Sequence, residues 1–231
     1  MPALNKRLIC AANMLQKGRV VADIGTDHAF LPIYLVQNGI SPFVIACDIA
    51  KKPLAVAQQN IKKRGLQSKI QLRLAPGLTA VEPQECGAVT ITGMGGETIA
   101  DIIAAAPWLQ SPSYQLVLQP MSCTDRLRRY LDQNGFEILR ETAVYSQTRI
   151  YTVLHAEFTG KLPEKNAAFA YVGKLPLNGD ALSKKLIEKQ ICTLQKCAAA
   201  LKQVPQKQAQ YQQIAKALDE LEPLCRQQLW L

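Results

Sequence analysis

Short runs of β-branched residues alternate with segments of helical periodicity along the first two thirds of this chain, and this alternation restricts its fold most strongly. The expected strands cover residues 20–24, 43–47, 70–74, 88–92 and 115–118, and the expected helices 8–15, 31–37, 53–64, 97–105 and 124–133. Strands that alternate with helices form a parallel sheet covered on both faces. Two further runs, 136–144 and 149–157, predict antiparallel strands joined around Ser146. The pattern predicts a doubly wound α/β fold with a seven-stranded mixed sheet.

The last third of the chain predicts a linker followed by helices. Residues 159–180 hold Gly160, Pro163, Gly173, Pro176 and Gly179, which are typical of a linker. Two apolar stripes at helical spacing follow on either side of Pro205: Leu182, Leu186, Cys192 or Leu194, and Leu201; then Ile214, Leu218, Leu221 and Leu224 or Cys225. We expect an α/β domain at 1–158, a linker at 159–180 and an antiparallel, coiled-coil-like helical hairpin at 181–231. Its Gln- and Lys-rich outer face suits either contact with RNA or a solvated appendage.

The charge of the chain favours a polyanionic partner without requiring one. The 27 Lys and Arg against 18 Asp and Glu give a formal charge of +9. Residues 1–180 hold 19 basic and 14 acidic residues, and residues 181–231 hold 8 and 4, so the tail is the more basic part per residue. Neutralising phosphates releases counterions, which is why such an excess suits nucleic acid.

Other features of composition exclude several classes of protein. No apolar run approaches the roughly 20 residues that span a bilayer, and the N-terminal segment lacks the features of an export signal. We therefore expect a cytoplasmic protein with no membrane partner. The seven cysteines form no C-x-x-C pair and only two histidines accompany them, which favours reduced thiols and no metal site.

The string Asp23-Ile-Gly25-Thr26-Asp27-His28-Ala stands where the first strand ends. Glycine permits a tight turn and close approach of a ligand at the carboxyl edge of a parallel sheet. Asp27 takes the place of the second glycine of a dinucleotide motif and would repel a pyrophosphate, so a cationic or zwitterionic ligand is favoured. S-adenosylmethionine is such a ligand, and Asp48, at the end of the second strand, can accept its two ribose hydroxyls. An ordinary aspartate at a strand end is the alternative for Asp48.

Two further strings follow the fourth and fifth strands. Thr92-Gly93-Met94-Gly95-Gly96 is expected to be a loop that borders the cleft, where its glycines let the backbone pass close to a base or to the transferred methyl group. The glycines could also serve only to start the next helix. Gln119, in Leu118-Gln-Pro120-Met121, could hydrogen-bond the edge of a base or belong to a capped turn.

These strings, together with Arg7-Leu8, Leu31-Pro32 and Arg149-Ile-Tyr151, resemble the bacterial TrmK-type tRNA (adenine(22)-N(1))-methyltransferases over essentially the whole chain. The resemblance implies a Rossmann-like class I methyltransferase domain that uses S-adenosylmethionine, a helical C-terminal domain and methylation of an adenine at N1, at position 22 of tRNA. The cofactor residues it implies are Asp23, Gly25, Thr26, Asp27, His28, Asp48, Ile49, Pro76, Gly77, Gly93 and Met94. The substrate residues it implies are Arg7, Gly95, Gly96, Gln119, Pro120, Arg126, Arg129, Arg149 and Tyr151.

Methyl transfer to adenine N1 is an in-line displacement by a lone pair that the base already carries, so positioning is the enzyme's main task. A carboxylate near the base would stabilise the cationic product, and Asp27 is the candidate, with His28 as a positioning or proton-accepting neighbour. Alternatively, Asp27 binds the cofactor's ammonium and His28 caps the following helix. We expect basic groups, including Lys6 and Arg128, to hold the RNA, although Arg128 and Arg129 could instead form only a solvated helix face. Phe30, Tyr34 and Tyr151 are expected to be stacking partners or core residues.

Three departures from the family pattern affect what the chain binds. Pro76 replaces an acidic residue that faces the cofactor adenine in the family, and Met121 and Thr152 replace Asn and Glu on the target side. These changes keep two alternatives open: methylation of another RNA or of a protein, and a non-catalytic binding module that retains the fold. The sequence does not determine the oligomeric state, and a monomer is compatible with it.

Overall fold

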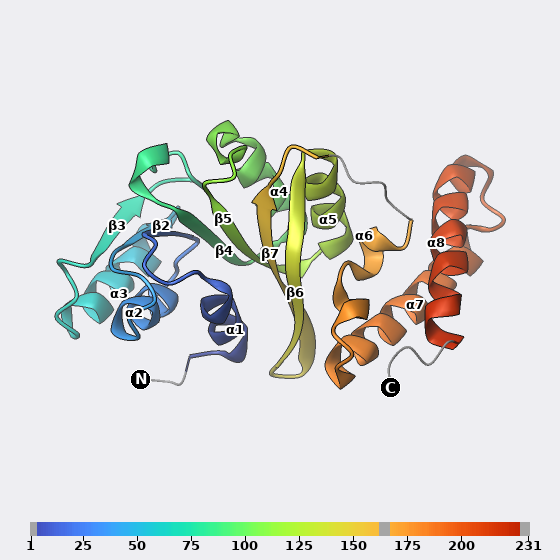
Figure 1. The fold of residues 1–231 in the computed structure, drawn as a ribbon, viewed down its shortest axis with the longest axis horizontal. Helices are drawn as coiled ribbons and strands as arrows, with labels where there is room; N and C mark the ends of the chain where they lie inside the picture. The colour runs from blue at the N-terminus through green and yellow to red at the C-terminus, as the bar shows by residue number, and fades with distance from the viewer. Residues whose placement is uncertain (1–3, 162–166, 227–231) are drawn as a thin grey trace.

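The computed structural model describes residues 4–161 and 167–226. Its sheet holds β1 (Val21–Ile24), β2 (Val44–Asp48), β3 (Ile70–Leu74), β4 (Ala88–Gly95), β5 (Gln115–Ser122), β6 (Phe136–Ser146) and β7 (Arg149–Phe158). The spatial order is β3-β2-β1-β4-β5-β7-β6, with the first five strands parallel and β7 antiparallel to both neighbours (Figure 1). The predicted seven-stranded mixed sheet is confirmed.

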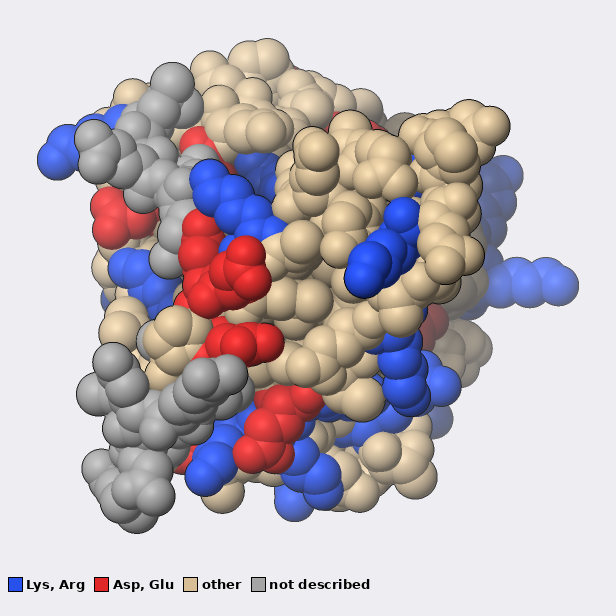
Figure 2. All heavy atoms as spheres, turned by 90° about the vertical axis from the view of Figure 1, so that its right-hand side faces the viewer, with Lys and Arg blue, Asp and Glu red and all other residues tan. Residues whose placement is uncertain are grey.

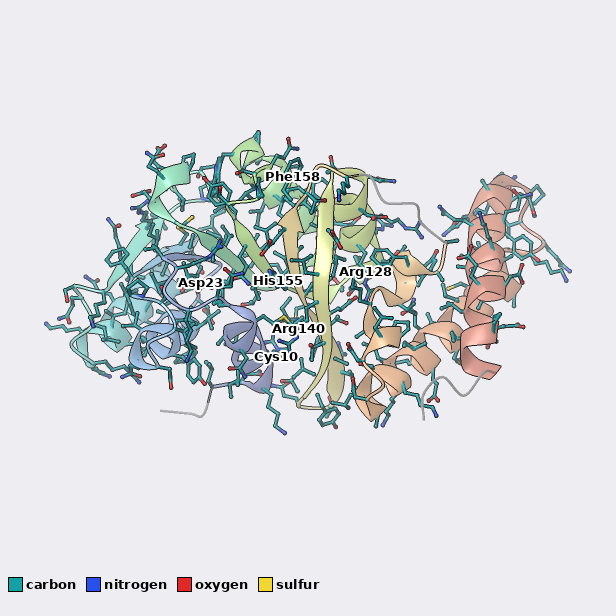
Figure 3. All side chains as sticks on the ribbon, viewed as in Figure 1. Cys10, Asp23, Arg128, Arg140, His155 and Phe158 are labelled. Atoms are coloured by element: carbon teal, nitrogen blue, oxygen red, sulfur yellow. The ribbon has the colours of Figure 1, made fainter. Side chains whose placement is uncertain are left out.

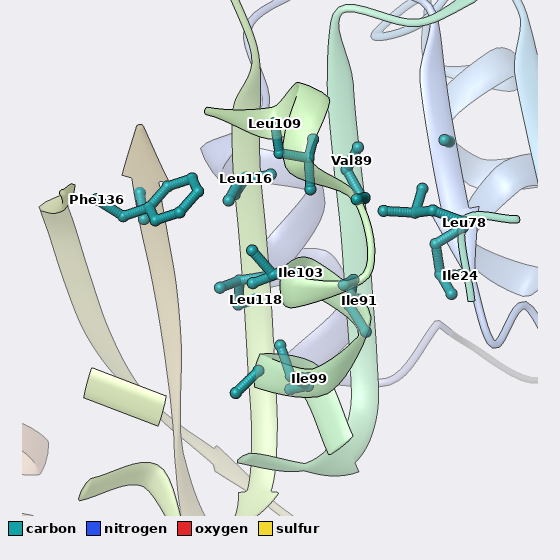
Figure 4. Close-up of a cluster of buried hydrophobic side chains, with 14 of the residues drawn as sticks. Ile24, Leu78, Val89, Ile91, Ile99, Ile103, Leu109, Leu116, Leu118 and Phe136 are labelled. Atoms are coloured by element: carbon teal, nitrogen blue, oxygen red, sulfur yellow. The ribbon is translucent and has the colours of Figure 1, made fainter. Parts of the chain in front are cut away.

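Helices cover both faces of the sheet. These are α1 (Lys6–Met14), α2 (Phe30–Gln37), α3 (Lys51–Lys62), α4 (Gly96–Ala104) and α5 (Thr124–Gln133). Neighbouring residues of a strand point to opposite faces. Leu116 and Leu118 of β5 accordingly join Ile99 and Leu127 in the core beneath α4 and α5, whereas Val117 joins the core beneath α1, α2 and α3. Figure 4 shows the first of these cores.

Strands β4 and β5 are longer than the sequence predicts. Residues 93–95 continue β4, where Met94 pairs with Pro120 and Gly95 with Ser122 across two shifts of register. The glycine-rich string is therefore the irregular end of a strand, and its expected assignment to a loop is wrong. Backbone pairing with β5 extends β4 here, although glycine has a low intrinsic strand propensity.

A third core lies beside the sheet and joins the C-terminal helices to it. The segment 159–180 contains α6 (Phe169–Val172) and the 3₁₀ turn η3 (Leu175–Leu177), and α7 (Ala181–Leu201) and α8 (Gln208–Arg226) follow, separated by the turn η4 (Pro205–Lys207). Their buried side chains pack with Ala143 of β6: Ala168, Val172, Leu175, Ile187, Leu194, Ile214 and Leu221. The helical hairpin is confirmed. Of the two residues considered for the first apolar stripe, Leu194 is the buried one, and Cys192 is exposed.

The three-part division of the chain remains a prediction. Pro163 and the last five residues lie outside the described residues, as do the side chains of Leu224 and Cys225. Within the described part, no helix is both long and apolar enough to cross a membrane.

Candidate functional site

Asp23 places a carboxylate inside the protein, one residue before β1 ends (Figure 3). Its side chain is 2% exposed, and it accepts a 2.7 Å hydrogen bond from the hydroxyl of Thr90, its partner in the register of β4. Burial raises the pKa of Asp23 to about 6, and the hydroxyls of Thr90 and Thr26 oppose this rise. A cation beside the carboxylate would offset the cost of burying its charge. This part of the site therefore suits a positively charged group.

The turn after β1 connects this carboxylate to a second one on β2. Gly25 has a φ of +74°, and the N–H groups of Gly25 and Thr26 both donate to the carbonyl of Cys47 at 2.9 Å. The N–H of Asp27 then donates to Oδ2 of Asp48 at 2.9 Å. The expected neighbours Asp23, Gly25 and Asp48 are thus brought together at the carboxyl edge of the sheet.

A cavity of about 310 Å³ opens beside this turn. Its lining comes from α1, from the β1–α2 segment and from the end of β4: Arg7, Leu8, Asp23, Gly25, Thr26, Asp27, Phe30, Leu31, Thr92 and Gly93. The hydroxyl of Thr26 is buried there and makes no hydrogen bond of normal geometry to any residue that the structure describes, although it lies close enough to Asp23 to lower that pKa. A buried polar atom without a partner is costly, so a ligand that hydrogen-bonds Thr26 would be favoured.

Asp27 lines this cavity, and His28 lies beside Asp27. Their side chains are 66% and 39% exposed, and His28 Nε2 is 3.4 Å from Asp27 Oδ1. The alternative that His28 caps the next helix is wrong: Ala29 is the N-cap of α2, and no side chain caps it. Asp27 and Ala29 both have positive φ, at 52° and 58°. Such conformations cost energy in residues other than glycine and are concentrated at functional sites.

Met94, at the end of β4, and Gly96, the first residue of α4, have structural roles. A Cβ on Gly25 would lie 2.2 Å from Met94 Cε, so this methionine packs against the turn after β1. A Cβ on Gly96 would lie 2.2 Å from the carbonyl oxygen of Cys123, which shows that the close approach of two backbones requires glycine there. Gly95 has no such contact, since its nearest neighbour would be Ser122 Oγ at 3.5 Å.

Gln119 does not present its amide to the cleft. It is fully buried, its oxygen accepts a hydrogen bond from Arg7 Nη1, and its Nε2 donates to the carbonyl of Pro120 at 2.7 Å. The guanidinium of Arg7 also lies over the ring of Tyr151, 5.3 Å from its centroid. The expected contact of Gln119 with a base edge therefore finds no support in this geometry, and Arg7 covers one face of the Tyr151 ring.

The expected cofactor residues after β2 and β3 are not among the residues that line the 310 Å³ cavity. Ile49 is 74% exposed, beside Asp48. Pro76 and Gly77 line a different cavity, of about 570 Å³, together with one face of α4 and Trp108. Gly77 packs against Ile102, which would lie 3.3 Å from a Cβ at this position.

The expected basic residues have different surroundings. Arg126 forms an ion pair with Glu97, and Arg129 lies over the ring of Tyr171 at 5.0 Å. Arg149 is exposed where β7 begins, at the same edge of the sheet as the cavity. Arg128 is 2% exposed in an ion pair with Glu141, so the expectation that it contacts RNA or forms a solvated helix face is wrong.

The two other aromatic candidates, Phe30 and Tyr34, also have different surroundings. Phe30 lines the cavity, whereas Tyr34 packs against the core beneath α2. Lys6, at the start of α1, is exposed next to Arg7. Within the described residues, no cluster of three His, Cys, Asp or Glu could hold a metal ion.

Sequence reasoning did not assign Leu8, Leu31, Thr90 or Thr92 to the site. Leu8 and Leu31 line the cavity; both stand in strings that carry the family resemblance, but their apolar side chains gave no reason to assign them a role in binding. Thr90 could be recognised only from the β1–β4 register, which pairs it with Asp23. Thr92 lines the cavity at the start of the glycine-rich string that already indicated this region.

Comparison with known proteins agrees with this arrangement. A family model described as a methyltransferase domain matches residues 4–154. The chain is similar to the tRNA (adenine(22)-N(1))-methyltransferase of Bacillus subtilis, with 33% identity over 94% of this chain and 87% of the relative. It also resembles the crystal structure of the B. subtilis m1A22 tRNA methyltransferase TrmK, with a TM-score of 0.86, 29% identity and coverage of 97% and 99% of the two chains.

A second solved structure is relevant to the cavity. The putative tRNA (m1A22) methyltransferase Sp1610 of Streptococcus pneumoniae, in complex with S-adenosyl-L-methionine, gives a TM-score of 0.79 at 31% identity, with 92% of this chain and 98% of that chain covered. The likeness extends over the C-terminal helices as well as the sheet. The chain belongs to the methyltransferase-domain family and, within it, to the TrmK-type tRNA (adenine(22)-N(1))-methyltransferases.

Proposed function

We propose that this protein transfers a methyl group from S-adenosylmethionine to N1 of an adenine in tRNA, with position 22 as the target. The observation that carries the proposal is the 310 Å³ cavity with its buried Asp23, on a chain that is 33% identical to a tRNA (adenine(22)-N(1))-methyltransferase over 94% of its length. A tRNA substrate also gives the basic chain a polyanionic partner and agrees with location in the cytoplasm.

The cavity fits the chemistry of S-adenosylmethionine, which supplies a methyl group on a positively charged sulfur. Asp23 would hold the ammonium of the methionine part, and the unpartnered hydroxyl of Thr26 could accept or donate a further hydrogen bond. Asp48 would face the ribose, with each oxygen already oriented by a backbone N–H, from Asp27 and Ala50, and a lone pair left on each. Ile49, Pro76, Gly77, Gly93 and Met94 are the other residues that we assign to the cofactor.

The acceptor side of the reaction would lie where Asp27 and His28 meet the cavity. Adenine becomes cationic as N1 takes the methyl group, and the exposed carboxylate of Asp27 would stabilise that charge. His28, 3.4 Å from Asp27, would orient this carboxylate or accept a proton from the N6 amino group. N1 lies on the Watson–Crick edge, so the target base must be unpaired or extruded before it reacts.

The substrate residues would surround the same edge. Arg126, Arg129, Arg149 and Tyr151 lie on α5 and β7. Gly95, Gln119 and Pro120 lie near the ends of β4 and β5, and Gly96 begins α4. The face over the C-terminal helices in Figure 2 carries acidic and basic side chains intermixed. We therefore place the RNA first at the carboxyl edge of the sheet.

Methylation of unmodified total tRNA with radiolabelled S-adenosylmethionine, followed by nucleoside mapping, tests the proposal. We expect label in 1-methyladenosine, at position 22 when single tRNA transcripts are used. Label in another nucleoside or in protein would favour one of the alternative substrates. Binding of the cofactor without any transfer would favour the non-catalytic module.

Variants test the assignment of Asp27. We expect Asp27→Asn to lower kcat at least tenfold while the cofactor still binds, because its carboxylate acts on the developing charge of the base. Glu188→Gln, which neutralises an exposed acid on α7, is the matched control and should leave both quantities unchanged. Unchanged turnover in Asp27→Asn would contradict the catalytic assignment.

A further inference from the structure

Arg7 is the one positively charged side chain that lines the 310 Å³ cavity, among lining residues that all lie in the described part of the chain. It stands on the first turn of α1, where the side chain of Asn5 caps the helix by accepting a 3.0 Å hydrogen bond from the Arg7 N–H. The negatively and positively charged groups therefore lie in different parts of the cavity. Asp23 and Asp27 supply carboxylates in one part, and Arg7 supplies a guanidinium beside Gly93 in another.

Two contacts from distant parts of the chain fix the position of that guanidinium. Its Nη1 donates to the oxygen of Gln119, and its plane lies over the ring of Tyr151. Gln119 is itself fixed, because it is fully buried and its Nε2 donates to the carbonyl of Pro120 at 2.7 Å. The glutamine cannot rotate its amide without leaving a buried polar group unpaired, so Arg7 has a rigid acceptor.

The remaining donors of Arg7 are available to a ligand. Within residues 4–161 and 167–226, Nε and Nη2 of Arg7 make no hydrogen bond. A guanidinium presents its N–H groups as a planar fork that matches the oxygens of a phosphate. It would be a poor partner for the target base itself, because adenine becomes positively charged when N1 is methylated and an adjacent cation would oppose that change.

We propose, on the basis of the function proposed above, that Arg7 binds the phosphate on the 5′ side of the target adenosine, and that Gln119 is a positioning residue that holds Arg7. The extruded nucleotide would be held at both ends. Its phosphate would contact Arg7, and its base would enter beside Asp27, where a carboxylate favours the developing positive charge. This arrangement replaces the expected contact between Gln119 and the base.

A phosphate-replacement cycle tests this contact. The substrate is a tRNA with a single neutral methylphosphonate 5′ to the target adenosine, and the protein variant is Arg7→Met, which keeps the aliphatic stem. For the unaltered protein we expect the methylphosphonate to lower kcat/KM by roughly 10- to 100-fold, the worth of one charge-assisted hydrogen-bonded contact. Arg7→Met should lose a similar factor on natural tRNA and less than about threefold more on the altered tRNA.

Gln119→Met tests the positioning role in the same assay. It should lower kcat/KM for tRNA by about tenfold in the natural background and have little further effect in the Arg7→Met background, since its role acts through Arg7. The double variant removes both partners of the buried hydrogen bond and should keep the melting temperature close to that of the natural protein, which excludes unfolding as the cause. The dissociation constant for S-adenosylmethionine should stay within about threefold in all three variants, and a larger rise in Arg7→Met would assign Arg7 to the cofactor carboxylate and overturn the proposed contact.

Arg64→Met is the control for net charge. Arg64 stands just beyond α3, where its guanidinium donates to the carbonyl of Asn60 at 2.8 Å, and the variant should leave kcat/KM unchanged. If the methylphosphonate lowers kcat/KM of Arg7→Met by the same factor as it lowers that of the unaltered protein, the two changes act independently and the proposed contact is overturned. The methyltransferase activity would then still be established. Absence of tRNA methylation by the unaltered protein would overturn the proposed function and this inference with it.

Discussion

Arg128, labelled in Figure 3, and Glu141 form a buried ion pair that joins the sheet to the segment leading into the C-terminal helices. Arg128 Nε and Nη2 donate to Glu141 Oε1 at 3.0 and 2.5 Å, and its Nη1 donates to the carbonyls of Ala170 and Tyr171 at 3.1 and 2.7 Å. The other carboxylate oxygen accepts the N–H of Lys174 at 2.9 Å. Substituting Glu141 therefore removes the counter-ion of Arg128 and, at the same time, the acceptor of the Lys174 N–H.

The expected cost of Glu141→Ala follows from this geometry. The side chains of Arg128 and Glu141 are 2% and 0% exposed, so the substitution leaves a guanidinium in the interior without its counter-ion. Breaking a buried pair in this way costs about 3–5 kcal/mol, out of the roughly 5–15 kcal/mol by which a protein of ordinary stability is folded. The double substitution Arg128→Met with Glu141→Leu removes both charges and should cost less than the single one.

Urea denaturation followed by circular dichroism measures this effect. Glu137→Ala is the matched control, because Glu137 lies on the same strand and its carboxylate is 3.6 Å from the ammonium of Lys174, but it is 45% exposed. An exposed pair contributes about 0–1 kcal/mol, so the control should differ little from the natural protein. A loss below 1 kcal/mol in Glu141→Ala, equal to that of Glu137→Ala, would refute the reasoning. A separate early transition would show that the C-terminal helices unfold before the sheet.

Three further predictions concern the site. Gly96→Ala should destabilise the protein by at least about 2 kcal/mol in the same assay, because its Cβ would lie 2.2 Å from the backbone oxygen of Cys123, whereas Gly95→Ala should cost less than about 1 kcal/mol; equal losses would contradict this. Burial raises the pKa of Asp23 from 3.8 to about 6, so the folded state binds more protons between these values and the free energy of unfolding should fall by about 2–3 kcal/mol as the pH rises through them. Asp23→Asn should remove this dependence in denaturation series from pH 4 to 7, and identical profiles would disprove it. The dissociation constant for tRNA should rise at least tenfold between 50 and 200 mM salt in filter-binding measurements, since several phosphate contacts are expected, and a flat response would exclude a phosphate-dominated interface.

The sheet was predictable because its strands form short apolar runs that are separated by helices of ordinary length. Residues 70–74 were predicted without error, because apolar side chains occupy every second position of that strand. The ends of β4 and β5 were missed because no side-chain pattern marks them: glycine and proline are disfavoured in strands, and only pairing between the two backbones extends them. Sequence patterns report side-chain burial, and they carry little information on pairing that the backbone alone decides.

The site was predictable where its residues are close in sequence or follow neighbouring strands. Asp23, Gly25 and Asp48 meet because parallel strands end at one edge, as expected. The contact between Arg7 and Gln119 spans 112 positions and depends on how α1 packs beside β5, so no local pattern reveals it. Arg7 and Gln119 were both assigned to the substrate side. Only the three-dimensional arrangement shows that Gln119 is buried and contacts Arg7.

The ion pairs that several arginines form explain why the formal charge of +9 was a weak guide to the RNA site. Arg73 is paired with Glu85 at 2.6 Å in a partly exposed ion pair and Arg128 with Glu141 in a buried one, so both are engaged in contacts within the molecule and contribute structure. Arg126 is also paired, with Glu97, but its side chain is 64% exposed and the pair can exchange its glutamate for a phosphate at little cost. The RNA interface should therefore depend on a few cations at the carboxyl edge, of which Arg7 is held in place before the substrate arrives and Arg126 becomes available when its ion pair opens.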